Sequence, residues 1–490
     1  MLKKHRLRII ISYIAVLIYF GIDRSIEYAT DSYAALMMDD NWKVKVYENG
    51  RVLQGLLYYI IEQFHFSSGI KYQISYLSGF IFLGLSIIIL SLIISEYVKN
   101  DILSIILSFI CIVNPFFVDF FLFIEKGMFC FVIFLNACAV YITNKLFSDN
   151  KGNSFFSDKK IISALIILAC LLVSVLMYQT LISVYVVLCL PIIALNPDRF
   201  IVKNMFVGLM YVLPMAIAFV LAKFVFPVDR LAARDGFYSS LKAVAGTIYD
   251  VCLGKFSYLS KGIFTLYLIL LFVCIGAFQT YINNHPLKHC LYLAYVIIGC
   301  TVVSFGIVFF NDSAVAPRVI YSFGYLFGIV LLYIMSNIRA DMTKSAFSII
   351  LKGSYSALIM VLLITEFIIF QKCFIERYRC NQNDLYLSNI IGEKIKEYEE
   401  TSGNTVDTLC YYSDMSRSWQ DPGFDKTDSS TRAGATGWSR TYSINYYLGT
   451  EYVEGEPDEK MLAYFKTVNW DTLSDKQFVF EKNKLHICIY

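Results

Sequence analysis

Acidic and basic residues gather in one short polar segment near the N-terminus, between residues 23 and 51. Its candidates for chemistry are Asp31, Asp39, Asp40, Glu48 and Arg51. A carboxylate can take the proton from an attacking hydroxyl as a general base. An arginine can hold a leaving phosphate through two parallel hydrogen bonds. The segment therefore has the residue types for a transfer in which a hydroxyl displaces a phosphate. For any single carboxylate, simple solvation of an exposed loop explains its presence about as well.

Three further polar positions stand where apolar runs are interrupted. Arg318 follows Pro317 at a helix junction, where it either holds a phosphate or anchors a helix end at the membrane interface. Gln179 interrupts a long apolar run and either binds sugar hydroxyls or caps a helix turn. Glu125 and Lys126 form a charged pair with the same ambiguity and are weaker candidates.

The sequence does not indicate a cofactor or a structural metal. It has five histidines and no His-Glu-x-x-His motif, and the spacing of Cys373 and Cys380 does not suit a zinc knuckle. Oxygen ligands from Asp39 and Asp40 are compatible with a divalent cation, although adjacent acids are common in loops. The chain has no Walker A motif, dinucleotide fingerprint or Gly-x-Ser-x-Gly motif, which removes the usual support for nucleotide-driven transport and hydrolysis.

The composition is that of a membrane protein. Of 490 residues, 57% are hydrophobic and 17% are charged, and the mean hydropathy is +0.58. Soluble proteins have about 45–50% apolar and about 25% charged residues, so this chain has too little polar surface to cover a water-soluble globule. The net charge of +3 gives no basic excess for nucleic acid.

Apolar stretches of spanning length predict eleven transmembrane helices. The candidates lie near residues 8–23, 74–98, 102–118, 127–146, 161–178, 180–197, 204–226, 262–282, 289–310, 318–336 and 346–370. Lys and Arg are concentrated in the short loops on the N-terminal side of the membrane, which predicts a cytoplasmic N-terminus. An odd number of spans then places the C-terminus outside the cytoplasm.

The chain is predicted to have two domains. Residues 1–370 form the transmembrane domain and include a first outer loop over 24–73, which contains the carboxylates. Residues 371–490 are polar and form a small soluble domain outside the cytoplasm. This domain is predicted to be α+β, because helical spacing of apolar residues is followed by strand-like runs at 408–412, 477–480 and 485–489.

The order of motifs in the first outer loop resembles a known family. Thr30-Asp31-Ser32-Tyr33 is followed by Asp39-Asp40 and by Glu48-Asn49-Gly50-Arg51, which heads an apolar helix. This pattern resembles bacterial serotype-converting glucosyltransferases of the Gtr type II family. The resemblance implies a polytopic GT-C type fold with the catalytic base in the first outer loop, best matched by Asp31, with Asp39 and Asp40 as second choices. It also implies that Arg51 holds phosphate.

The resemblance implies an enzyme of the bacterial cytoplasmic membrane. It would transfer a sugar such as glucose from a polyprenyl-phosphate donor to a lipid-linked or cell-surface glycan, for example O-antigen, on the outer face. Beside Arg51, the predicted substrate-binding residues are Tyr33, Glu48, Gln179 and Arg318. Two alternatives stay open. One is a transporter or flippase of a lipid-linked glycan, which usually has ionisable residues inside its spans. The other is an O-antigen polymerase or ligase.

Overall fold

The structure is a computed structural model, and it describes residues 2–21, 28–38, 40–148, 158–226, 237–253, 286–310, 316–337, 346–412, 431–467 and 474–488. The chain divides into two compact units. Unit 1 comprises Met1–Arg24, Asp40–Phe121 and Glu125–Gln371, and unit 2 comprises Ser25–Asp39, Leu122–Ile124 and Lys372–Tyr490. The polar segment that contains the candidate carboxylates is therefore shared between the two units.

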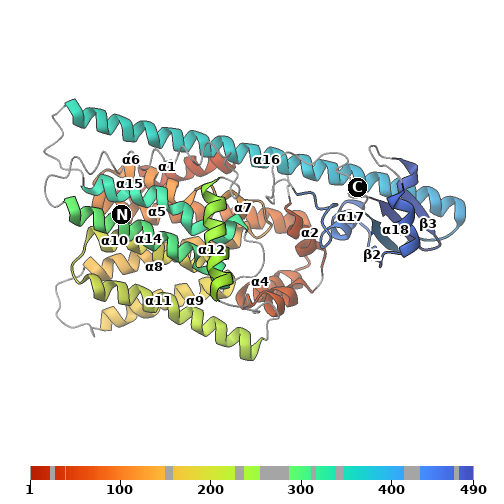
Figure 1. Cartoon of the computed structure of the whole chain (residues 1–490), viewed down its shortest axis with the longest axis horizontal. Helices are drawn as coiled ribbons and strands as arrows, with labels where there is room; N and C mark the ends of the chain where they lie inside the picture. Colours follow the sequence, from red (N-terminus) through yellow and green to blue (C-terminus); the bar gives the residue numbers. More distant parts are fainter. Residues whose placement is uncertain are drawn as a thin grey trace. The chain divides into compact units, whose positions relative to one another are not determined.

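Unit 1 is built from helices (Figure 1). Its described elements are α1 (Leu2–Phe20), α3 (Asn41–Lys43), η1 (Val44–Glu48), α4 (Val52–Gln63), α5 (Ser68–Val98), α6 (Asp101–Ile112), α7 (Val118–Phe121), α8 (Lys126–Ser148), α9 (Asp158–Met177), η2 (Gln179–Leu181), α10 (Ile182–Leu195), α11 (Phe200–Val220), η3 (Leu221–Val225), α12 (Phe237–Cys252), α14 (Pro286–Phe310), η4 (Pro317–Gly324) and α15 (Tyr325–Asn337). Helix α8 packs between α5 and α9, and α10 packs against α14.

Seven helices within the described ranges are long and apolar enough to cross a membrane. They are Ser68–Val98, Lys126–Ser148, Asp158–Met177, Phe200–Val225, Leu287–Val308, Pro317–Asn337 and Tyr355–Ser402. The predicted class, a polytopic helical membrane protein, is therefore confirmed. The number of eleven spans stays a prediction, and its candidate at 262–282 lies outside the described residues.

Small residues bring α5 and α8 close together. A Cβ atom at Gly127 would lie 2.0 Å from Ser78 Oγ and 2.7 Å from the carbonyl oxygen of Ser75, so only glycine fits there. Close approach at small residues is a common way for transmembrane helices to pack. The Gly127 amide also donates a hydrogen bond of 3.0 Å to Ser75 Oγ. These contacts fix the first turn of α8, where Lys126 lies.

Helix α16 (Ala346–Ser402) is one continuous helix of 57 residues, shown in cyan in Figure 1. It passes without a break through the domain boundary predicted at residue 370. Its C-terminal part belongs to unit 2. The other described elements of unit 2 are α2 (Thr30–Met37), β1 (Thr408–Tyr412), α17 (Arg440–Leu448), β2 (Val453–Glu454), α18 (Glu459–Lys466), η6 (Asp475–Gln477), β3 (Phe478–Glu481) and β4 (Lys484–Cys488).

Unit 2 contains a four-stranded sheet in the order β2-β1-β4-β3. Strand β1 runs parallel to β2 and β4, while β3 and β4 form an antiparallel pair. The strand-like runs in the sequence correspond to β1, β3 and β4. Apolar residues of α16, Leu387, Ile391 and Ile395, pack with Leu409 and Leu485 of the sheet in one buried core. Their spacing of about one helical turn places them on one face of α16.

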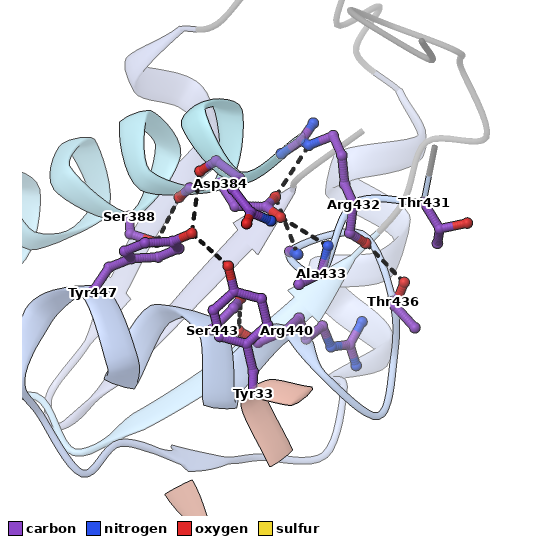
Figure 2. Close-up of polar contacts among 12 residues, drawn as sticks. Tyr33, Asp384, Ser388, Thr431, Arg432, Ala433, Thr436, Arg440, Ser443 and Tyr447 are labelled. Carbon is purple, nitrogen blue, oxygen red and sulfur yellow. Dashed lines mark hydrogen bonds and ion pairs between the residues drawn. The ribbon is translucent and has the colours of Figure 1, made fainter. Parts of the chain in front are cut away.

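A buried carboxylate holds the loop that precedes α17. Asp384 of α16 accepts hydrogen bonds from the Ala433 amide at 2.8 Å, and from the Gly434 amide and Arg432 Nε at 3.2 Å each (Figure 2). The side chains of Asp384 and Arg432 are only 1% and 5% exposed. Charge-assisted hydrogen bonds of this kind are the strong ones in proteins, so they fix the loop over residues 431–439.

We predict that Asp384→Ala destabilises unit 2 by about 3–5 kcal/mol, because it breaks a buried ion pair together with two backbone hydrogen bonds. Thermal unfolding of the full-length protein, with limited proteolysis of the loop, measures the effect. Asp475→Ala is the matched control, since its carboxylate is 87% exposed. Equal unfolding temperatures for the two variants would contradict this account of the loop.

Candidate functional site

Asp31 lies in the first turn of α2, in unit 2. A carboxylate is favourable at this end of a helix because of the helix dipole. Its Oδ1 accepts a hydrogen bond of 2.8 Å from the indole Nε1 of Trp438. The backbone around it is also held, since Ser439 Oγ donates to the Thr30 carbonyl oxygen and the Ile124 amide donates to Ser32 Oγ at 3.0 Å. Asp31 is therefore a partly exposed carboxylate on a fixed backbone.

Tyr33 lies on the same helix but is buried in unit 2. Its side chain is 0% exposed, and its hydroxyl shares a short hydrogen bond with the Tyr447 hydroxyl (Figure 2). Its ring packs against Tyr28 and Tyr446, each at a centroid distance of 5.5 Å. Burial raises the pKa of the Tyr33 hydroxyl well above its usual range. Tyr33 thus packs α2 against α17, a role that differs from the substrate contact predicted from the sequence.

The other carboxylates of the polar segment are solvated where they are described. Asp40 is 61% exposed and pairs with Lys43 at 2.7 Å, and exposed pairs of this kind contribute little to stability. Glu48 is exposed at the end of η1. Asp39 lies outside the described residues. Within the described ranges, no group of three or more His, Cys, Asp or Glu side chains is arranged to hold a metal ion.

Arg51 is positioned by a tight turn in unit 1. Gly50 adopts a left-handed conformation with φ of 65°, which glycine adopts without strain. The side-chain amide of Gln179 donates to the carbonyl oxygens of Asn49 and Gly50, both at 3.1 Å. The Arg51 guanidinium lies over the ring of Tyr178, 4.4 Å from its centroid. Gln179 therefore holds the backbone that presents Arg51, which the sequence alone did not distinguish from direct sugar binding.

A buried ion pair joins η1 to the residue preceding α8. Lys45 Nζ lies 2.9 Å from Glu125 Oε1, and the two side chains are 12% and 6% exposed. Burial by itself raises the pKa of the Glu125 carboxyl. The charge of Lys45 and hydrogen bonds from Lys45 and Tyr58 outweigh burial, so the pKa lies below its ordinary value. Burial and the nearby Glu125 raise the pKa of the Tyr58 hydroxyl.

A second buried pair joins α7 to η4. Asp119 is 0% exposed, and its Oδ2 accepts hydrogen bonds from the backbone amide of Arg318 at 3.1 Å and from Nη1 of Arg318 at 3.2 Å. Lys126 is 2% exposed and lies over the ring of Tyr72, 4.4 Å from its centroid. These residues add two further cations to unit 1, of which Lys126 lies beside an aromatic ring.

One aromatic core connects these positions in unit 1. The ring centroid of Tyr178 lies 4.9 Å from that of Phe129 and 5.9 Å from that of Phe120. The ring centroid of Phe120 lies 5.1 Å from that of Tyr321. Tyr178 supports Arg51, Phe120 follows Asp119, and Tyr321 lies in η4 with Arg318. We define Lys45, Arg51, Lys126 and Arg318, with Asp119 and Glu125, as the cation cluster.

Sequence reasoning found part of this cluster. It selected Arg51 and Arg318, ranked Glu125 and Lys126 lower, and missed Lys45. It also selected Gln179, which lies outside the cluster and holds the backbone before Arg51. The sequence signal for a buried pair was the apolar surroundings of each charge. Lys45 lies between Val44 and Val46, and Glu125 follows a long aromatic run. A charge surrounded by apolar residues is costly to bury unless it is paired.

The sequence matches the family described as glucosyl transferase GtrII over residues 24–334. The chain belongs to this family. The resemblance noted in the first outer loop is thereby confirmed, and this GtrII protein is a membrane glucosyltransferase. No curated protein matches the chain. The match includes Asp31 of unit 2 and the whole cation cluster of unit 1, and it ends before the C-terminal residues of unit 2.

We predict that Glu125→Gln destabilises this GtrII protein by about 3–5 kcal/mol, because it leaves the Lys45 charge buried without a carboxylate. The double variant Lys45→Met/Glu125→Gln should recover most of the lost stability, because it removes the buried charge as well. Thermal unfolding in detergent at several pH values measures the stability of both variants.

The same experiment tests the direction of the Glu125 pKa. A depressed folded-state pKa gives stability that is fully present above the unfolded value of about 4.3 and is lost as the pH falls through the folded value. Wild type should therefore lose this contribution below about pH 4.3, whereas Glu125→Gln should lack that part of the pH dependence. Identical pH profiles would contradict the ion pair.

Proposed function

We propose that this GtrII glucosyltransferase transfers glucose from a polyprenyl-phosphate donor to a lipid-linked or cell-wall glycan on the outer face of the bacterial cytoplasmic membrane. The observation that carries the proposal is the cation cluster within the helical, membrane-embedded unit. Lys45 and Arg318 are paired with Glu125 and Asp119, and the cluster as a whole brings four cations and two carboxylates together beside aromatic rings. This excess of cations in an apolar unit suits a ligand that is both lipidic and anionic. A polyprenyl phosphate has both properties.

In the proposed reaction a hydroxyl oxygen of the acceptor glycan attacks the anomeric carbon of glucose. A new carbon–oxygen bond forms, and the bond from the anomeric carbon to the phosphate oxygen breaks. Asp31 takes the hydroxyl proton as general base. The bonding electrons leave with the polyprenyl phosphate, and Arg51 and Arg318 stabilise its charge. A single displacement of this kind inverts the anomeric configuration. No cofactor takes part in this scheme.

The proposed side of the membrane follows from the distribution of basic residues in the short loops. Lys3, Lys4 and Arg6 precede the first apolar stretch, and the cytoplasmic side of membrane proteins is rich in Lys and Arg. The N-terminus would then be cytoplasmic. The first outer loop and the C-terminal residues of unit 2 would face the space outside the membrane, where finished glycans are modified.

One observation favours the transporter alternative. Glu366 of α16 is 1% exposed and lies in a helix long and apolar enough to span the membrane. Ionisable residues inside spans often mark transport pathways. Asp31 and the cation cluster, by contrast, lie outside the interiors of the spans or at their ends, which suits chemistry on an amphiphilic substrate.

Transfer in proteoliposomes tests the proposal. The donor is radiolabelled glucosyl polyprenyl phosphate, the acceptor is glycolipid extracted from bacterial cell envelopes, and UDP-glucose replaces the lipid donor in a parallel reaction. We expect label in the glycan with the lipid donor and none with UDP-glucose. Transfer from UDP-glucose alone would contradict the proposed donor. Movement of glycolipid across the bilayer without transfer would favour the transporter.

We predict that Asp31→Asn lowers kcat for transfer by about 10²–10⁴-fold, the usual contribution of a general base. The amide keeps the size of the side chain and an oxygen that can accept the Trp438 hydrogen bond, so the fold should be preserved. Glu459→Gln, a neutralised carboxylate in the first turn of α18, is the matched control and should keep the wild-type rate. Full activity in Asp31→Asn with loss in Asp39→Asn or Asp40→Asn would move the base to that residue.

A further inference from the structure

Trp438 is a large aromatic side chain that remains mostly in water. It is 67% exposed, whereas the aromatic side chains Tyr411 and Phe478 of unit 2 are buried. An ideal Cβ atom at the neighbouring Gly437 would lie in open space, so the loop is not crowded at the position next to Trp438. An exposed tryptophan on such a loop can receive the apolar face of a ligand.

The loop that carries Trp438 is rigid for an exposed loop. Asp384 binds its first residues, as described above (Figure 2). Thr436 Oγ1 donates to the Arg432 carbonyl oxygen at 2.8 Å, and the Ser439 amide donates to the Thr436 carbonyl oxygen at 2.9 Å. A ring on a fixed loop loses little conformational entropy when it binds a ligand.

The edge of the indole is also fixed. Its Nε1 donates to Asp31 Oδ1 at 2.8 Å, so this edge of the ring is held by the carboxylate that we assign as the base. The residues joined by this bond are 407 positions apart in the chain. Trp438 lies beyond the segment that matches the GtrII family, whereas Asp31 lies within it. The C-terminal part of unit 2 thus adds an aromatic surface directly beside the proposed base.

We propose that Trp438 binds the acceptor glycan by stacking its indole face against a pyranose ring, so that a sugar hydroxyl is presented to Asp31. This inference rests on the proposed function and extends it to acceptor recognition. The C–H face of a pyranose is apolar and buries well against an aromatic ring, while the ring hydroxyls remain available to a neighbouring carboxylate.

The acceptor fits this surface better than the donor does. The donor needs cations for its phosphate, and the cation cluster belongs to unit 1. Near Trp438 in sequence, Arg440 is engaged by Glu454 through two hydrogen bonds and lies over the ring of Tyr411. The surface therefore offers an aromatic face and a carboxylate, which together recognise a hydroxyl-rich ligand such as an oligosaccharide.

Steady-state kinetics of the full-length protein in nanodiscs test the proposal. The probe for the acceptor is glycolipid extracted from bacterial cell envelopes. We expect Trp438→Ala to raise the KM for acceptor by at least about tenfold, equivalent to about 1.4 kcal/mol, with the KM for donor unchanged. Trp438→Phe keeps an aromatic face, so it should raise the KM for acceptor less than Trp438→Ala does. Tyr386→Ala is the matched control, because it removes a ring on α16 that is 59% exposed. Its KM for acceptor should equal that of the wild type.

A binding measurement separates this inference from the proposed function. Oligosaccharides released from the same glycolipids should protect the protein from acrylamide quenching of tryptophan fluorescence, and Trp438→Phe should abolish the protection. An unchanged acceptor KM in Trp438→Ala, or protection that survives in Trp438→Phe, would overturn the role of Trp438. Protection without any glucose transfer by wild type would overturn the proposed function and leave the binding surface intact.

Discussion

The cost of burying a charge is the constraint on which the functional parts of this protein depend. A buried ion must be paired and hydrogen-bonded, or the fold loses several kcal/mol. Lys45 pairs with Glu125, Arg318 with Asp119, and Arg432 with Asp384. Each pair joins two segments that are distant in sequence and fixes a loop or helix end that contains a candidate functional residue. The same ion pairs that stabilise the fold therefore position the chemistry.

The first polar segment serves both units. Within it, helix α2 belongs to unit 2 with the C-terminal sheet, and the residues from Asp40 to Arg51 belong to unit 1 with the membrane helices. The proposed base and its tryptophan partner belong to unit 2, while the cations proposed to hold the donor phosphate belong to unit 1. Under the proposals above, acceptor recognition comes from unit 2 and donor recognition from unit 1, and the GtrII family match includes both Asp31 and Arg51.

Much of this organisation follows from local sequence, and the rest depends on tertiary contacts. Hydropathy predicts the helical membrane part, because spans need long apolar runs. Short strand-like runs indicate strands such as β1, and Asp31 and Arg51 stand out as charges in a motif. The Lys45–Glu125 pair joins residues 80 positions apart, and the Trp438–Asp31 bond joins residues 407 apart. Local patterns contain no information on such pairs. For the same reason Tyr33 looked like a ligand contact, although the fold buries it in an aromatic cluster.

The central claim is that a single carboxylate, Asp31, activates the acceptor while cations receive the phosphate, in one displacement. The anomeric configuration of the product tests this claim most directly. Glucosyl polyprenyl phosphate of defined configuration is incubated with wild-type protein and acceptor glycolipid, and the anomeric proton coupling of the transferred glucose is measured by NMR. The account predicts the configuration opposite to that of the donor. Retention of the donor configuration would require two successive displacements or attack on the same face as the departing phosphate, and would contradict it.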